Sequence, residues 1–138
     1  LEYIAGAEQL TKVFGYWPSF HDAEVLWIKL DRRGPIVESA VHVFEITNEI
    51  DADGCYVLRN HLLVHLRFNK VVEVAVKDFN HQNALMGLRL LDLRSRQLEG
   101  IAWEVHFDPS WGLDATFQCA SVEVVSVTPC DRCGNPIS

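Results

Sequence analysis

The chain has 138 residues, of which 49% are hydrophobic and 22% charged, and its formal net charge is −7. This composition is typical of one globular domain and argues against a disordered chain. The acidic balance disfavours binding to nucleic acid or to an anionic membrane, because both need a basic protein surface, and it is compatible with a basic protein partner.

Membrane and export signals are not evident in the sequence. No segment approaches the ~20 consecutive apolar residues that span a bilayer. The first residues lack a basic segment followed by an apolar run, so we expect no signal peptide. We expect free thiols, because a chain of this size does not need a disulfide framework; the cysteines are Cys55, Cys119, Cys130 and Cys133.

The first predicted element is a short helix over residues 7–14. Leu10, Val13 and Phe14 fall on one helical face, and Gly15 follows at a position suited to a C-cap. Pro18 prevents the helix from continuing.

From Glu24 the apolar period changes to two, which predicts strands. The first strand has Leu26, Ile28 and Leu30 on one face. A turn at residues 31–35 joins it to a second strand at 36–47, so the two form an antiparallel hairpin. Residues 48–54 are a predicted polar loop.

Residues 61–68 alternate again, with Leu62, Val64, Leu66 and Phe68 predicted to face inward. Val72, Val74 and Val76 keep the same parity, and the sequence leaves open whether Asn69-Lys70 is a turn or a bulge. Residues 85–93 fit a helix or a strand, and we favour a strand after Gly87.

Further strands are predicted at residues 101–107 and 113–128, the latter as one long strand or two successive ones, with a turn at 108–112 between them. The fold class is therefore α+β and mostly antiparallel β, with one short N-terminal helix packed on a sheet of about six to eight strands. We expect a single domain over residues 1–129 and a polar tail over 130–138.

The pair His21-Asp22 with Glu24 is the first candidate for catalysis, because a carboxylate beside an imidazole can orient a general base or bind a metal. A metal-dependent or acid/base hydrolase that uses these residues, with His106 and Asp108, is thus one alternative. Adjacent residues in an extended chain point to opposite faces, however, which favours a structural role in a turn.

Metal binding has little support elsewhere. His61 and His65 lie about 13 Å apart on a strand at ~3.3 Å per residue, too far to share one ion. Cys130 and Cys133 have the spacing of a zinc knuckle, but no second such pair completes a site. We therefore expect no bound metal or other cofactor.

Four stretches carry a family pattern: Phe14–Val25 (FGYWPSFHDAEV), Phe79–Asn83 (FNHQN), Trp111–Cys119 (WGLDATFQC) and Val124–Pro129 (VVSVTP). In this order and spacing they resemble the immunity protein 50 family of bacterial polymorphic toxin systems. The resemblance covers about residues 10–130. It implies a cytoplasmic, non-enzymatic protein that binds and neutralises a cognate toxin.

Many targets of immunity proteins are basic, so the acidic loop is the candidate electrostatic contact; its acids are Glu45, Glu49, Asp51 and Asp53. Tyr56 and Trp111, both in predicted loops, are the candidate aromatic anchors. A homodimer formed through exposed strand edges is a further alternative.

Overall fold

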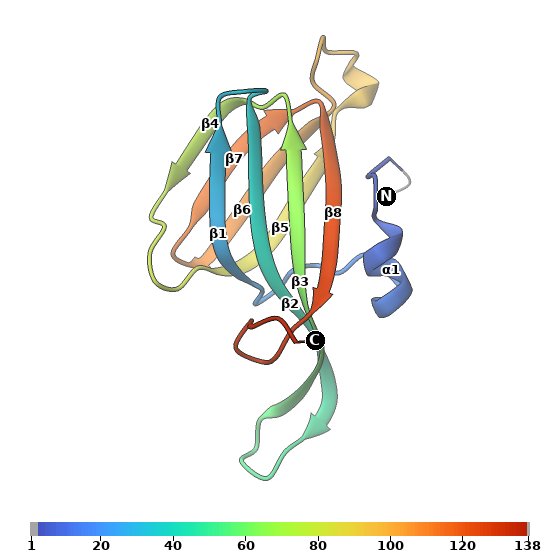
Figure 1. The fold of residues 1–138 in the computed structure, drawn as a ribbon, viewed down its shortest axis with the longest axis vertical. Helices are drawn as coiled ribbons and strands as arrows, with labels where there is room; N and C mark the ends of the chain where they lie inside the picture. The colour runs from blue at the N-terminus through green and yellow to red at the C-terminus, as the bar shows by residue number, and fades with distance from the viewer. Residues whose placement is uncertain (1–2, 138) are drawn as a thin grey trace.

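The computed structural model describes residues 3–137, which contain one α-helix, one 3₁₀ turn and eight strands (Figure 1). The helix is α1 (Glu8–Phe14) and the 3₁₀ turn is η1 (Arg94–Arg96). The strands are β1 (Glu24–Asp31), β2 (Ile36–Ile50), β3 (Tyr56–Asn69), β4 (Val72–Lys77), β5 (Ala84–Asp92), β6 (Trp103–Trp111), β7 (Asp114–Cys119) and β8 (Ser121–Pro129). The mostly antiparallel α+β prediction is confirmed.

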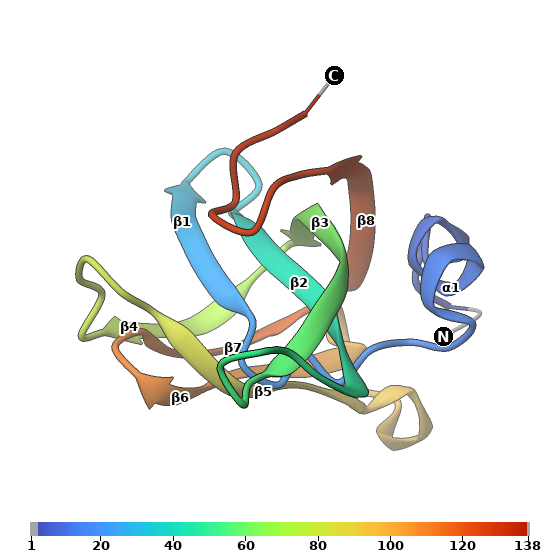
Figure 2. The same ribbon diagram turned by 90° about the horizontal axis from the view of Figure 1, so that it is seen from below.

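The eight strands form one antiparallel sheet in the order β4-β7-β6-β5-β1-β2-β3-β8. At its centre β1 and β5 pair only through Glu24 and Ala84, and there the sheet folds back on itself. Figure 2 shows the resulting two layers, β1-β2-β3-β8 over β5-β6-β7-β4. The core lies between the layers, where the ring of Phe68 packs 5.9 Å from that of Phe107 and 5.0 Å from that of Phe117.

The N-terminal segment covers the β8 edge of the sheet. Ala5 bridges Glu123 in parallel, its carbonyl accepts the Val124 N–H at 2.7 Å, and the Gln9 side chain donates to the Val124 carbonyl. As predicted, α1 ends at Gly15, which adopts a left-handed conformation (φ 83°). Within residues 3–137 no helix has the length and apolar character to cross a bilayer.

Strands β2 and β3 are longer than predicted. The predicted polar loop at 48–54 is in part strand, because β2 runs to Ile50 and pairs with Tyr56 at the start of β3. The Thr47 hydroxyl donates to the Val57 carbonyl at 2.7 Å and ties the two strands together there. The alternation of 62–68 is confirmed: Leu62, Val64, Leu66 and Phe68 are buried.

Two predicted faces are wrong. The Asn69-Lys70 dipeptide separates two strands, and β4 crosses to the other layer to pair with β7, so Val72 and Val74 are exposed and only Val76 packs on the core. In β1 a bulge between Val25 and Trp27 reverses the parity. Val25 is therefore buried and Leu26 exposed, and of the predicted face only Ile28 packs on the core, because Leu30 is also exposed.

The two remaining ambiguities are resolved. Residues 84–92 form a strand, and residues 113–128 give two successive strands, β7 and β8. The turn predicted at 108–112 is shorter, because β6 continues to Trp111. Beyond β8 the chain folds back: the Cys130 N–H donates to the His61 carbonyl, and the Ile137 N–H donates to the Pro129 carbonyl.

Candidate partner-binding site

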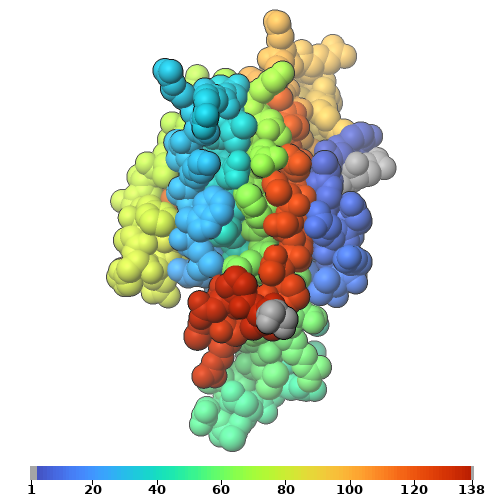
Figure 3. All heavy atoms as spheres, in the orientation of Figure 1, coloured from blue at the N-terminus to red at the C-terminus, as the bar shows by residue number. Residues whose placement is uncertain are grey.

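The far ends of β2 and β3 project from the two-layered body as a two-stranded hairpin (Figure 1), which the space-filling view shows as a separate protrusion (Figure 3). We call residues 45–59 the distal hairpin. It carries four acidic side chains against one basic, a net charge of −3 in a chain whose net charge is −7. Five of the six predicted partner-binding residues lie on it: Glu45 and Glu49 on β2, Asp51 and Asp53 in the turn, and Tyr56 on β3.

One face of the distal hairpin is charged. Glu45 and Arg59 are cross-strand partners, and the Arg59 guanidinium forms an ion pair with Glu49. The Asn60 side-chain amide donates to the Glu45 carboxylate at 2.8 Å. Glu49 and Arg59 are exposed and Glu45 is half-buried, so the attraction between these charges is screened by solvent.

The turn at the tip is organised by Asp51. Its carboxylate accepts the N–H of Asp53 at 2.9 Å and of Cys55 at 3.0 Å, and its own N–H donates to the Cys55 carbonyl. Gly54 takes the left-handed conformation (φ 81°) that closes the turn. Asp51 therefore shapes the tip, whereas Asp53 is exposed and presents its charge to a partner.

The opposite face of the distal hairpin is apolar, which sequence reasoning missed. Ile46 pairs with Leu58 and Ile50 with Tyr56, so their side chains share one face. Ile50 is 63% exposed and Tyr56 60% exposed. The alternation of Ile46, Asn48 and Ile50 before the turn, with Tyr56 and Leu58 after it, is the sequence signal that indicates this face.

A cleft of about 230 Å³ lies at the base of the hairpin. The stretch after α1 forms one wall, including Tyr16 and His21, and β2 forms the other with Phe44, Glu45 and Ile46. The apolar face of the hairpin therefore continues through Ile46 into a concave, partly aromatic surface on the body.

Trp111 is the sixth predicted contact residue and lies apart from this surface. Across successive strands, Trp111 of β6 pairs with Ala84 of β5, Ala84 pairs with Glu24 of β1, and Glu24 pairs with His42 of β2. From His42 the strand advances nine residues to Asp51, about 30 Å at ~3.3 Å per residue. Trp111 is exposed at the level of the body and not of the hairpin tip.

The residues of the hydrolase alternative do not converge. His21 lies 3.5 Å from the Asp22 carboxylate in an exposed turn, with its other ring nitrogen 2.9 Å from the Met86 carbonyl. Glu24 is turned away and accepts the Asn83 N–H at 2.6 Å. Farther along, His106 pairs with Glu104 and Asp108 with Arg89. Residues 3–137 contain no group of three or more His, Cys, Asp or Glu side chains that could hold a metal ion.

Three of the four family-like stretches meet instead at a structural node, which we call the β1–β5 corner: Glu24, Val25, Asn83, Gly112 and Leu113. The buried Asn83 side chain accepts the N–H groups of Leu113 and Asn80, both at 3.0 Å, and donates to the Asn80 carbonyl at 2.8 Å. Its backbone carbonyl accepts the Val25 N–H at 2.9 Å. A Cβ on Gly112 would lie 2.3 Å from the Gln82 carbonyl oxygen, so only glycine fits this turn.

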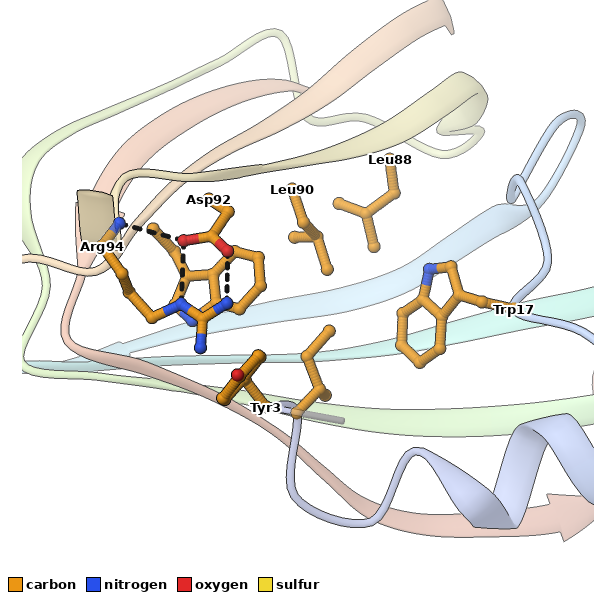
Figure 4. Close-up of a pocket in the computed structure, with 8 residues that line it drawn as sticks. Tyr3, Trp17, Leu88, Leu90, Asp92 and Arg94 are labelled. Carbon is orange, nitrogen blue, oxygen red and sulfur yellow. Dashed lines mark hydrogen bonds and ion pairs between the residues drawn. The ribbon is translucent and has the colours of Figure 1, made fainter. Parts of the chain in front are cut away.

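A cavity of about 670 Å³ lies between the N-terminal segment and the end of β5 (Figure 4). Trp17, Leu88 and Leu90 line it, and Arg94 stacks on the Tyr3 ring with 3.2 Å from its guanidinium carbon to the ring centroid. The same guanidinium pairs with Asp92, whose pKa it lowers to about 2. Through Arg94, this pair fastens Tyr3 of the N-terminal segment to the end of β5. Because Asp92 and Arg94 neutralise each other, the residues that line the cavity include no unpaired charge.

The buried histidine and cysteine side chains outside the distal hairpin pack within the protein, and burial shifts their pKa values. The buried His42 ring lies 2.9 Å from the His61 ring, nitrogen to nitrogen, and burial followed by the neighbouring His61 lowers the His42 pKa. Burial raises the pKa of Cys119 to about 12 and also raises that of Cys130, which keeps both thiols protonated. All four cysteines are free.

A family model described as immunity protein 50 matches residues 6–130. No curated protein and no solved structure matches the chain significantly.

Proposed function

The chain belongs to the immunity protein 50 family, and we propose that it binds and neutralises a basic toxin in the cytoplasm of the cell that makes both. The observation that supports the mode of binding is the distal hairpin. A projecting two-stranded segment with one acidic face and one exposed apolar face combines the two features of a protein interface, charge that steers encounter and apolar anchors that hold it.

The division of labour within the hairpin follows from its contacts. Glu45, Glu49 and Asp53 present negative charge and are proposed to accelerate association with a basic surface. Ile50 and Tyr56, on the apolar face, are proposed to be desolvated in the complex and to slow its dissociation. The cleft at the base of the hairpin extends the contact onto the body.

The test is co-expression with the toxin domain encoded beside this protein, with cell survival and formation of a one-to-one complex as readouts. The variant Glu45→Gln, Glu49→Gln, Asp53→Asn removes three charges and keeps Asp51, which the turn needs. We expect its association rate constant to fall about tenfold at low salt and the difference to shrink as salt rises.

The matched control is Glu8→Gln, Asp78→Asn, Glu99→Gln, which removes three exposed charges outside the hairpin. It should keep the association rate of the wild-type protein to within about twofold, because the charges that it removes lie outside the hairpin. Capture of no toxin domain by the wild-type protein, or equal slowing in both variants, would contradict the proposal.

A further inference from the structure

The two edge strands of the sheet differ in what covers them. The outer edge of β8 is bridged by the N-terminal segment through Ala5 and Gln9. The outer edge of β4 has no such cover: among the described residues, the backbone of Val72–Lys77 pairs only with β7. Figures 1 and 2 show β4 at the margin of its layer. One row of backbone hydrogen-bonding groups is therefore open to another strand.

The side chains of this open strand are unusually apolar for an edge. Val72 is 42% exposed and Val74 is 38% exposed, and Ala75 is exposed beside them. Next to Val74 lies an apolar hollow of about 300 Å³, lined also by Leu30 and Ile36. A strand that paired with β4 would bury these groups together with its own side chains.

The charges on β4 specify what kind of strand fits. Glu73 lies near its start and Lys77 at its end, and both are exposed. Lys77 contacts Asp114 at 3.7 Å, but its side chain remains 70% exposed and available to a second carboxylate. An antiparallel copy of the same segment brings the acidic end of each strand against the basic end of the other, with the small Ala75 near the two-fold axis.

We propose that β4 pairs antiparallel with β4 of a second copy of this chain, giving a symmetric homodimer with one continuous sheet. The bulge between Val72 and Ala75, where Glu73 takes a left-handed conformation (φ 54°), shortens the ladder that each strand offers. The dimer is therefore a weak, reversible one that forms as concentration rises. This inference concerns the chain alone and does not rest on the proposed toxin binding.

Sedimentation equilibrium of the purified full chain tests the proposal, under reducing conditions because Cys55 and Cys133 are exposed. We expect reversible conversion from monomer to dimer between micromolar and millimolar concentration. Glu73→Lys places like charges together at both ends of the two-fold contact and should raise the dissociation constant about tenfold. The double variant Glu73→Lys, Lys77→Glu restores opposite charges and should return the constant to within about threefold of the wild type.

Glu99→Lys makes the same charge change at an exposed position in the loop before β6 and should leave the dissociation constant unchanged. Unfolding curves of each variant confirm that it is folded, and amide hydrogen exchange should show concentration-dependent protection within β4. A wild-type chain that stays monomeric over the whole range overturns the proposal. So does a folded double variant that remains as weak as Glu73→Lys, or a Glu99→Lys variant that is equally weakened.

Discussion

At the β1–β5 corner the polar side chain of Asn83 is buried and hydrogen-bonded to the backbone of its own loop and of Leu113, whereas at the distal hairpin the polar side chains of Glu49 and Asp53 face solvent. The corner joins residues from three of the four family-like stretches, and it lies where β1 and β5 connect the two layers. The hairpin is less bound to the body and presents charge and apolar surface outward. In this molecule, the β1–β5 corner and the distal hairpin are thus spatially separate.

The largest expected effect is at the corner. Asn83→Ala leaves the buried Leu113 N–H without its acceptor, which costs about 1–3 kcal/mol, and also removes the acceptor of the solvent-accessible Asn80 N–H, which costs less. We expect the free energy of unfolding to fall by about 2–4 kcal/mol, measured by urea denaturation. If the fraction that remains folded binds the toxin domain with wild-type affinity, the corner is structural; a change in stability below ~1 kcal/mol would contradict its assignment.

The reverse pattern is expected at the tip of the hairpin. Tyr56→Ala removes an exposed ring, so its free energy of unfolding should change by less than about 0.5 kcal/mol. Affinity for the toxin domain should fall by about 2 kcal/mol, roughly 30-fold, mainly through faster dissociation, as measured by surface plasmon resonance. A Tyr56→Ala protein that binds as tightly as the wild type would remove the hairpin's apolar face from the interface.

A smaller effect concerns the base of the hairpin, where His42 is buried against His61 with Asp131 nearby. Its folded-state pKa lies below the ordinary value of 6.5, so the unfolded chain binds more protons as the solution becomes acidic. This contribution to stability is complete above about pH 6.5 and is lost as pH falls below it. His42→Gln should flatten the dependence of the unfolding free energy on pH in this window; a wild-type curve that is already flat there would contradict the burial argument.

The smallest effect tests how far the interface reaches. Trp111 is exposed on the body, three strands from His42 in the pairing that runs through Ala84 and Glu24. If the toxin contacts the distal hairpin and the cleft at its base, Trp111→Ala should change the affinity by less than twofold, as measured by isothermal titration calorimetry. A loss of tenfold or more would show that the partner spans both surfaces, and would restore Trp111 as an anchor.

Local sequence pattern predicted the elements that are buried on one side. The alternation from Leu62 to Phe68 reports a strand on the core, and Gly15 reports the end of α1. The faces of Val72 and Val74 were not predictable from alternation, because their exposure depends on pairing with β7, more than 40 residues away in sequence. Pairing partners are a tertiary property, and an apolar residue on an edge strand resembles one in the core.

The candidate site was predictable in its charge and not in its shape. The four acids of the hairpin are evident in the sequence, but polar residues on a projecting two-stranded segment give no burial signal that separates strand from loop. Asn83 was missed for the opposite reason: a single Asn in a polar loop looks exposed until the corner closes around it. The His21-Asp22 pair does come into contact, yet Glu24 turns to the Asn83 backbone and leaves it without further catalytic groups.

The separation between fold and binding surface is tested most directly by amide hydrogen exchange of the wild-type protein, free and with the toxin domain bound. The account predicts new protection within residues 45–59 and at the cleft below them, with the β1–β5 corner already protected in the free protein and unchanged on binding. Protection that appears on another surface while residues 45–59 exchange as in the free protein would contradict it.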